Sequence, residues 1–210
     1  MDELVEPRRI RLVAVGDELL TPTGDPRALG WLGRVLSKTP LHGVHLQPHI
    51  LAVPGEGVEA LSKRWEAEAA PRFGPVAGED AAERHLLVAL NDADLRTASS
   101  ARARLNLANI LDRASQQGIR CFVVGPVPGL DAEHNRRVAE LNRAYRDVAE
   151  RRGHPYVDAF TPLLDHAQWR EDLTANAGHP GQAAFGLIAW LVLHRGWFEW
   201  LDITEGPTST

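Results

Sequence analysis

Carboxylate, amide and imidazole side chains lie in several short polar turns of this 210-residue sequence. Asp17 and Glu18 are adjacent, Asn91 and Asp92 are adjacent, and His179 directly precedes a proline. A carboxylate and an imidazole are common partners in general acid–base chemistry, while an amide or a backbone N–H group can stabilise an oxyanion. The turns therefore hold the groups that a hydrolytic or binding site needs, provided that the fold brings them together.

The elements between these turns alternate between two kinds of pattern. Short apolar runs predict buried parallel strands, whereas apolar residues three and four apart predict helices. The strands are expected at residues 11–15, 85–90 and 121–124, with weaker candidates at 45–53 and 155–158, and the helices at 26–36, 57–70, 99–117, 134–152 and 181–194. Residues 71–80 are rich in Pro and Gly and predict a loop.

Five strand–helix alternations indicate an α/β fold, a three-layer α/β/α sandwich around a flavodoxin-like parallel sheet. Ligands of such folds bind outside the carboxyl ends of the strands, where the polar turns must meet. We expect a single domain over residues 1–203 and a flexible C-terminal tail over residues 204–210.

Composition limits the classes of partner. The formal net charge of −5 gives no reason to expect nucleic acid or an anionic membrane as partner. The apolar run at 185–193 is too short to span a bilayer, and the acidic start at residues 1–6 is unlike a secretory signal, so we expect a cytoplasmic protein. The single cysteine, Cys121, lies in a predicted buried strand, and we interpret it as an inert core thiol. We expect no cofactor, and a small-molecule substrate or ligand as the partner.

Two further groups of residues are interpreted from their surroundings. Trp190, Trp197, Phe198 and Trp200 cluster near the C-terminus, where they form either part of the core or a homodimer surface. The histidines other than His179 show no metal-ligand spacing and are interpreted as structural or exposed. They are His42, His45, His49, His85, His134, His154, His166 and His194.

The order of the turns resembles that of the GDSL/SGNH hydrolases over nearly the whole chain. The family's Gly-Asp-Ser-Leu block corresponds to residues 16–19, which read Gly-Asp-Glu-Leu, and its oxyanion-hole donors correspond to Gly55 and Asn91. Its Asp-x-x-His-Pro block corresponds to residues 176–180, with Asn176 in place of the acid and His179 as the base. The resemblance implies the SGNH hydrolase fold and an esterase or acylhydrolase type of site.

Two departures from the family pattern weaken the usual chemistry. Glu18 stands where the family has its serine, so no hydroxyl is present to attack an ester carbonyl. Asn176 brings no charge to stabilise an imidazolium, and in serine proteases loss of the acid costs about four orders of magnitude in rate. Asp17 is a candidate for the substrate side of the site, but a carboxylate in such a turn also suits a structural role, accepting backbone N–H groups.

Three hypotheses follow for the site. In the first, Glu18 and His179 form a non-serine pair that activates water against a small ester or acyl substrate. In the second, the protein is catalytically silent and binds a small ligand or a protein partner. In the third, Asp17, Glu18, Asp92 and His179 gather a divalent metal, which ranks last because no recognised ligand spacing supports it.

Overall fold

Five parallel strands form one sheet in the order β2-β1-β3-β4-β5. The computed structural model describes residues 6–204. The strands are β1 (Arg8–Gly16), β2 (Val44–Ala52), β3 (Glu83–Ala89), β4 (Arg120–Val124) and β5 (Tyr156–Val157). Every expected strand is present, and this order is that of flavodoxin-like doubly wound sheets.

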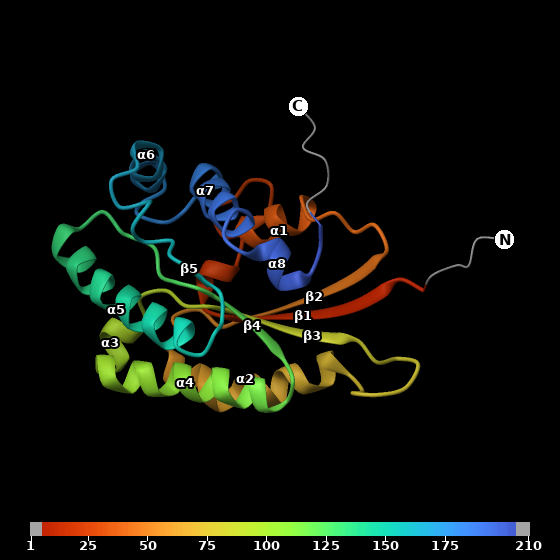
Figure 1. Ribbon diagram of the computed structural model, residues 1–210. Coiled ribbons are helices and arrows are strands. Elements are labelled where there is room, and N and C mark those ends of the chain that lie inside the picture. Colours follow the sequence, from red (N-terminus) through yellow and green to blue (C-terminus); the bar gives the residue numbers. More distant parts are fainter. Residues whose placement is uncertain (1–5, 205–210) are drawn as a thin grey trace.

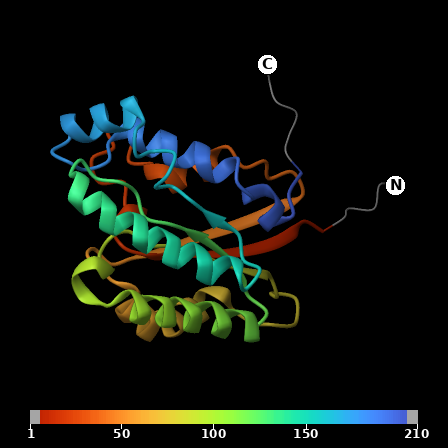
Figure 2. The same ribbon diagram turned by 60° about the vertical axis from the view of Figure 1, so that its left-hand side comes forward.

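Helices cover both faces of the sheet (Figure 1). One layer holds α1 (Gly30–Ser37), α6 (Ala167–Ala175), α7 (Gln182–Leu193) and α8 (Trp197–Leu201), and the other holds α2 (Val58–Phe73), α4 (Ser100–Gln116) and α5 (Ala132–Glu150). The short α3 (Asp94–Thr97) and the 3₁₀ helix η1 (Glu18–Leu20) follow β3 and β1. Figure 2 shows the sheet between the two helical layers, which confirms the α/β/α sandwich.

Alternate side chains of the central strands supply two separate cores. On β1, Ile10, Leu12 and Ala14 pack with residues of α1, α7 and α8, while Val13 and Val15 pack with residues of α2, α4 and α5. A strand covered on both faces must be apolar at successive positions, which is why these strands appear as continuous apolar runs.

The structure corrects the sequence prediction at several helices: the helix expected at 26–36 begins only at Gly30, and the short α3 was not expected. The helix α2 continues through Pro71 to Phe73, into the region predicted as a loop. A proline in the last turn removes one hydrogen bond near the helix end, so the helix tolerates it there. The helices α6 and α8 were not predicted, because each is short and has only a few apolar positions to reveal a period.

The aromatic residues near the C-terminus divide between core and surface. Trp197 and Trp200 are buried in the core with Phe122, whereas Trp190 on α7 is 57% exposed. The core interpretation is therefore confirmed for Trp197 and Trp200, and a homodimer surface stays a prediction that involves Trp190.

Other expectations concern Cys121 and the chain ends. Cys121 is buried, and burial raises the pKa of its thiol to about 12, as expected for an inert core cysteine. Most of the tail, residues 205–210, lies outside the described residues. Within residues 6–204, no helix combines the length and apolar character needed to cross a bilayer.

Close approach between β1 and β3 generates a stability prediction at Gly16. A Cβ atom at this position would lie 2.0 Å from the carbonyl oxygen of Ala89 on the neighbouring strand, so Gly16→Ala must push the strand ends apart. We expect a loss of about 3 kcal/mol or more in the free energy of unfolding, measured by urea denaturation. The matched control is Gly186→Ala on α7, where the new Cβ would meet nothing within 4 Å. There we expect no loss, and equal effects of the two substitutions would contradict the prediction.

Candidate functional site

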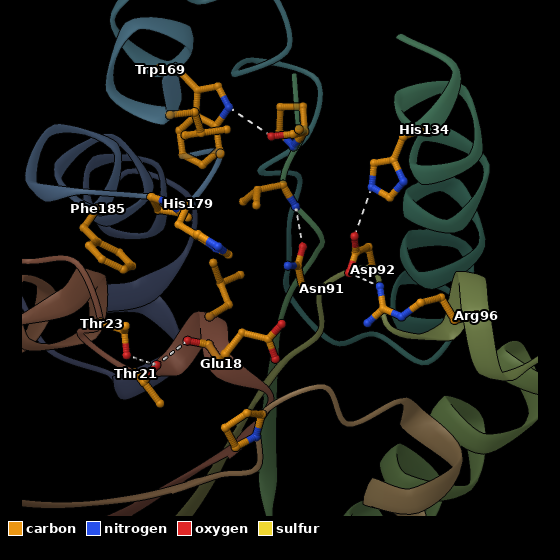
Figure 3. A pocket seen from close by; sticks show the side chains of 18 residues that line it. Glu18, Thr21, Thr23, Asn91, Asp92, Arg96, His134, Trp169, His179 and Phe185 are labelled. Atoms are coloured by element: carbon orange, nitrogen blue, oxygen red, sulfur yellow. Dashed lines mark hydrogen bonds and ion pairs between the residues drawn. The ribbon is translucent and has the colours of Figure 1, made fainter. Parts of the chain in front are cut away.

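A cavity of about 550 Å³ lies among the turns that follow the strands. Its walls come from the segments after β1 to β4, from the first turn of α5, and from α6, α7 and the turn between them (Figure 3). The lining residues are Glu18, Leu19, Thr21, Thr23, Pro54, Asn91, Asp92, Arg96, Val127, Pro128, Gly129, His134, Trp169, Leu173, Gly178, His179, Pro180 and Phe185. The carboxyl edge of the sheet thus carries the cavity, as the topology requires.

Glu18 lies on the cavity wall and bonds to the residue expected to serve an oxyanion. It is the first residue of η1, and its exposed carboxylate accepts the backbone N–H of Gly55 through Oε2 at 2.5 Å. Gly55 has φ of +71°, a left-handed conformation that glycine adopts without a steric cost. The donor that the resemblance assigns to an oxyanion is therefore already bonded to a carboxylate.

Asp17 does not line the cavity, which corrects its assignment to the substrate side of the site. It is only 1% exposed, and its two carboxylate oxygens accept the N–H groups of Leu19 and Asn91, each at 3.0 Å. The carboxylate thereby ties the turn after β1 to the turn after β3. Burial raises the pKa of Asp17 to about 7, with smaller raising effects from Glu18 and Asp92, while the two N–H groups oppose the shift.

Asn91, which the resemblance assigns as a donor, lines the cavity. Its backbone is held by Asp17, and its side-chain Oδ1 accepts the N–H of Val127 at 3.4 Å. With the oxygen held in this way, the amide nitrogen is turned toward the cavity (Figure 3).

His179 lines the cavity, but Asn176 does not support its ring. The side-chain amide of Asn176 donates instead to the carbonyl oxygen of Asp172 at 2.7 Å, where it caps the end of α6. The carbonyl groups at a helix end lack partners within the helix, so they accept hydrogen bonds from nearby amide groups. Asn176 therefore does not take the place of the acid beside His179, since no hydrogen bond joins their side chains among residues 6–204.

Asp172, which the sequence did not single out, holds the segment that carries His179. Its Oδ2 accepts the backbone N–H groups of Gly181 at 2.6 Å and of Ala184 at 3.1 Å, and so caps the N-terminus of α7. A capping residue normally directly precedes its helix, whereas Asp172 lies on α6. No local sequence signal could have identified it.

The turns after β2 and β3 are also fixed by buried carboxylates. Glu56, next to Gly55, accepts two hydrogen bonds from Arg64, which also donates to the carbonyl oxygen of Leu51 at 3.0 Å. Asp94 accepts the N–H of Val58 at 2.9 Å and so caps α2. These contacts make the cavity rim a rigid set of turns.

His134 is a cavity residue that the sequence reasoning missed. Its Nε2 lies 3.0 Å from Oδ2 of Asp92, and Oδ1 of Asp92 lies 3.4 Å from a guanidinium nitrogen of Arg96. All three residues line the cavity, and the side chain of His134 is 32% exposed, which agrees with its interpretation as structural or exposed. The available signal was positional, because α5 follows β4 and must begin at the carboxyl edge of the sheet.

The remaining wall is largely apolar. Leu19, Val127, Leu173 and Phe185 contribute hydrocarbon surface, and the buried indole of Trp169 donates to the carbonyl oxygen of Pro128 at 3.0 Å. An apolar wall with a few fixed polar groups is typical of small-molecule sites.

The structure does not support the metal hypothesis. Within the described part of the chain, no group of three or more His, Cys, Asp and Glu side chains is arranged to hold a metal ion. Both carboxylate oxygens of Asp17, one of the proposed ligands, are engaged by backbone N–H groups.

The raised pKa of Asp17 predicts a pH-dependent stability. A carboxyl whose pKa rises from 3.8 to about 7 on folding contributes stability that is present below pH 3.8 and is lost as the pH rises toward 7. We expect the loss to be on the order of a few kcal/mol. Denaturation of the wild type and of Asp17→Asn across this pH range isolates the effect, because other titrating groups cancel in the difference. An identical pH dependence in the two proteins would show that Asp17 is not responsible.

The cap at Asp172 predicts a second stability effect. Removing the carboxylate in Asp172→Ala leaves two N–H groups of α7 without an acceptor, so we expect a loss of about 1–2 kcal/mol in the free energy of unfolding. Amide resonances of the 178–181 segment should shift in the same variant, because that segment loses its anchor. Asp165→Ala is the control, since Asp165 is exposed just before α6. A neutral effect of Asp172→Ala would rule out the capping role.

Several solved structures share this fold at low sequence identity. A lipase/acylhydrolase from Enterococcus faecalis has a TM-score of 0.69 at 16% identity, covering 96% of this chain and 100% of that chain. TesA has a TM-score of 0.67 at 21% identity, covering 86% and 94%. Axe2, an acetylxylan esterase from Geobacillus stearothermophilus, has a TM-score of 0.64 at 16% identity, covering 96% and 97%. No curated protein sequence gives a significant match.

The family itself is identified by sequence. The profile of the GDSL-like lipase/acylhydrolase family matches residues 13–186, a segment that runs from within β1 into α7 and includes Glu18, Gly55, Asn91 and His179. This match spans most of the chain and confirms the resemblance drawn from the turns. The chain belongs to the GDSL-like lipase/acylhydrolase family.

Proposed function

We propose that this protein binds a small acyl-type ligand in its cavity without covalent turnover. The main observation behind the proposal is the hydrogen bond from the Gly55 N–H to the Glu18 carboxylate, at 2.5 Å. In an acyl-transfer enzyme this donor must be free to meet the charge that develops on the substrate oxygen. In this protein the Gly55 N–H group already donates to the Glu18 carboxylate.

The chemistry of the neighbouring residues agrees with this proposal. Glu18 supplies no hydroxyl, and its negative charge opposes an oxyanion beside it. A substrate oxygen would have to displace a charge-assisted hydrogen bond, which is among the stronger kinds in proteins. His179 has no carboxylate bonded to its ring within residues 6–204, so the orientation that a triad gives its base is absent as well.

The cavity nevertheless suits a ligand of the kind that the family handles. Its apolar wall accommodates a short acyl chain, and the Asn91 amide offers a donor to a carbonyl oxygen. The names of the structural relatives, a lipase/acylhydrolase and an acetylxylan esterase, point to the same class of compound. We therefore expect esters, amides or acids of short chain length as ligands.

A second candidate function is hydrolysis by Glu18 and His179 acting on water. It is favoured by the presence of both side chains on the wall of one cavity. No ion pair joins them in the described part of the chain, so this reaction requires Glu18 to leave Gly55 and approach the imidazole. The second candidate thus needs a rearrangement that the first does not.

Assays with short-chain p-nitrophenyl esters separate the two functions. We expect the wild type to show no turnover above buffer and no labelling by a fluorophosphonate. Glu18→Ser should gain weak esterase activity and labelling, because the substitution restores a hydroxyl and frees the Gly55 N–H group. Adding His179→Ala to Glu18→Ser should abolish the gain. Binding by the wild type is checked with N-(4-nitrophenyl)butanamide, a stable amide analogue, by ligand-observed NMR.

Two outcomes would count against the proposal. Wild-type turnover that Glu18→Gln or His179→Ala abolishes would replace it with the second candidate. Absence of both turnover and amide binding would remove the small-molecule function altogether. Circular dichroism of each variant confirms that the fold is retained.

A further inference from the structure

Asp92, Arg96 and His134 form a charged group on one side of the cavity, away from Glu18 (Figure 3). They come from three segments, namely the turn after β3, the helix α3 and the first turn of α5. Neither Arg96 nor His134 belongs to the family blocks described above. The group has no part in the proposed handling of the acyl carbonyl, so its arrangement calls for a separate explanation.

The hydrogen bonding of this group leaves donors of Arg96 available to a ligand. Asp92 directs one carboxylate oxygen to His134 at 3.0 Å and the other to Arg96 at 3.4 Å. The guanidinium of Arg96 has five N–H donors, and its side chain is 58% exposed. Asp92 therefore holds the side chains of His134 and Arg96 in place, and Arg96 keeps most of its donors available.

The charged side chains on the two sides of the cavity favour one orientation of a bound ligand. The carboxylate of Glu18 repels an anionic group, whereas the Arg96 guanidinium attracts one and can bind its oxygens in a bidentate manner. The apolar wall near Trp169 and Phe185 suits an uncharged hydrocarbon portion. A ligand with one apolar and one anionic end would therefore place its anion beside Arg96 and His134.

We propose that Arg96, held by Asp92 beside His134, forms a subsite for an anionic oxygen group of the ligand, a carboxylate or a phosphate. This inference rests on the proposed function, because it names the chemical class of ligand that the same cavity accepts. It makes Arg96 a specificity-determining residue and Asp92 a positioning residue.

Three probes of equal chain length test the subsite by ligand-observed NMR titration: hexanoate, hexyl phosphate and the neutral hexanamide. We expect at least one anion to bind the wild type about tenfold more tightly than hexanamide, as a charge-assisted hydrogen bond predicts. In Arg96→Gln the ratio of anion to hexanamide affinity should fall to about one. The anion that binds more tightly to the wild type identifies the ligand as a carboxylate or a phosphate.

The matched control is Arg104→Gln. Arg104 on α4 is also partly exposed and pairs with an aspartate, Asp147, at 2.8 Å, but it does not line the cavity. The control removes the same charge from the protein, so it should leave the anion preference of the wild type in place. A loss of preference in both variants would reveal a general charge effect and overturn the subsite.

The remaining outcomes separate the subsite from the proposed function. If hexanamide binds the wild type as tightly as both anions, the subsite is wrong while cavity binding stands. If the anion preference survives Arg96→Gln, the assignment to Arg96 is wrong. If none of the three probes binds, cavity binding fails and the subsite fails with it.

Discussion

A carboxylate buried beneath the cavity organises the edge of the sheet on which the site depends. Among residues 6–204 Asp17 has no cationic partner, and its oxygens accept the N–H groups of Leu19 and Asn91, which belong to different turns. An unsatisfied charge in such a place would be costly, so the two turns are held at one separation. That separation sets the distance between Glu18 and Asn91, which both line the cavity.

The same principle recurs around the rim. Glu56 binds Arg64 beside Gly55, Asp94 caps α2, and Asp172 caps α7 next to the turn that carries His179. Each carboxylate connects elements that are apart in sequence, and each is partly or fully withdrawn from solvent. The site is therefore positioned mainly by polar contacts with backbone N–H groups, on a scaffold that two apolar cores hold together.

Much of the fold could be predicted because its signals are local. Continuous apolar runs marked the buried strands, and periodic apolar positions marked the longer helices, since both faces of the sheet are covered. The short helices α6 and α8 escaped prediction because they carry too few periodic positions. In the site, Glu18, Gly55 and Asn91 were recognisable from their places after strands and His179 from the resemblance of residues 176–180, and the structure brings all four to one edge. His134 was missed, because only its position at the start of the helix after β4 indicates this edge, and no pattern in its neighbourhood marks it as a partner of Asp92.

The sequence alone determined which groups are present: a carboxylate instead of a hydroxyl at Glu18, an amide instead of an acid at Asn176, and the order of turns that identifies the family. Only the tertiary structure decided how these groups pair. Glu18 bonds Gly55 from 37 residues away, Asn176 turns to the end of α6 instead of His179, and Asp92 meets His134 from another element. The physical reason is that a hydrogen bond depends on distance and direction in space. Each side chain has several possible partners, and the linear order of residues does not show which of them lies within reach.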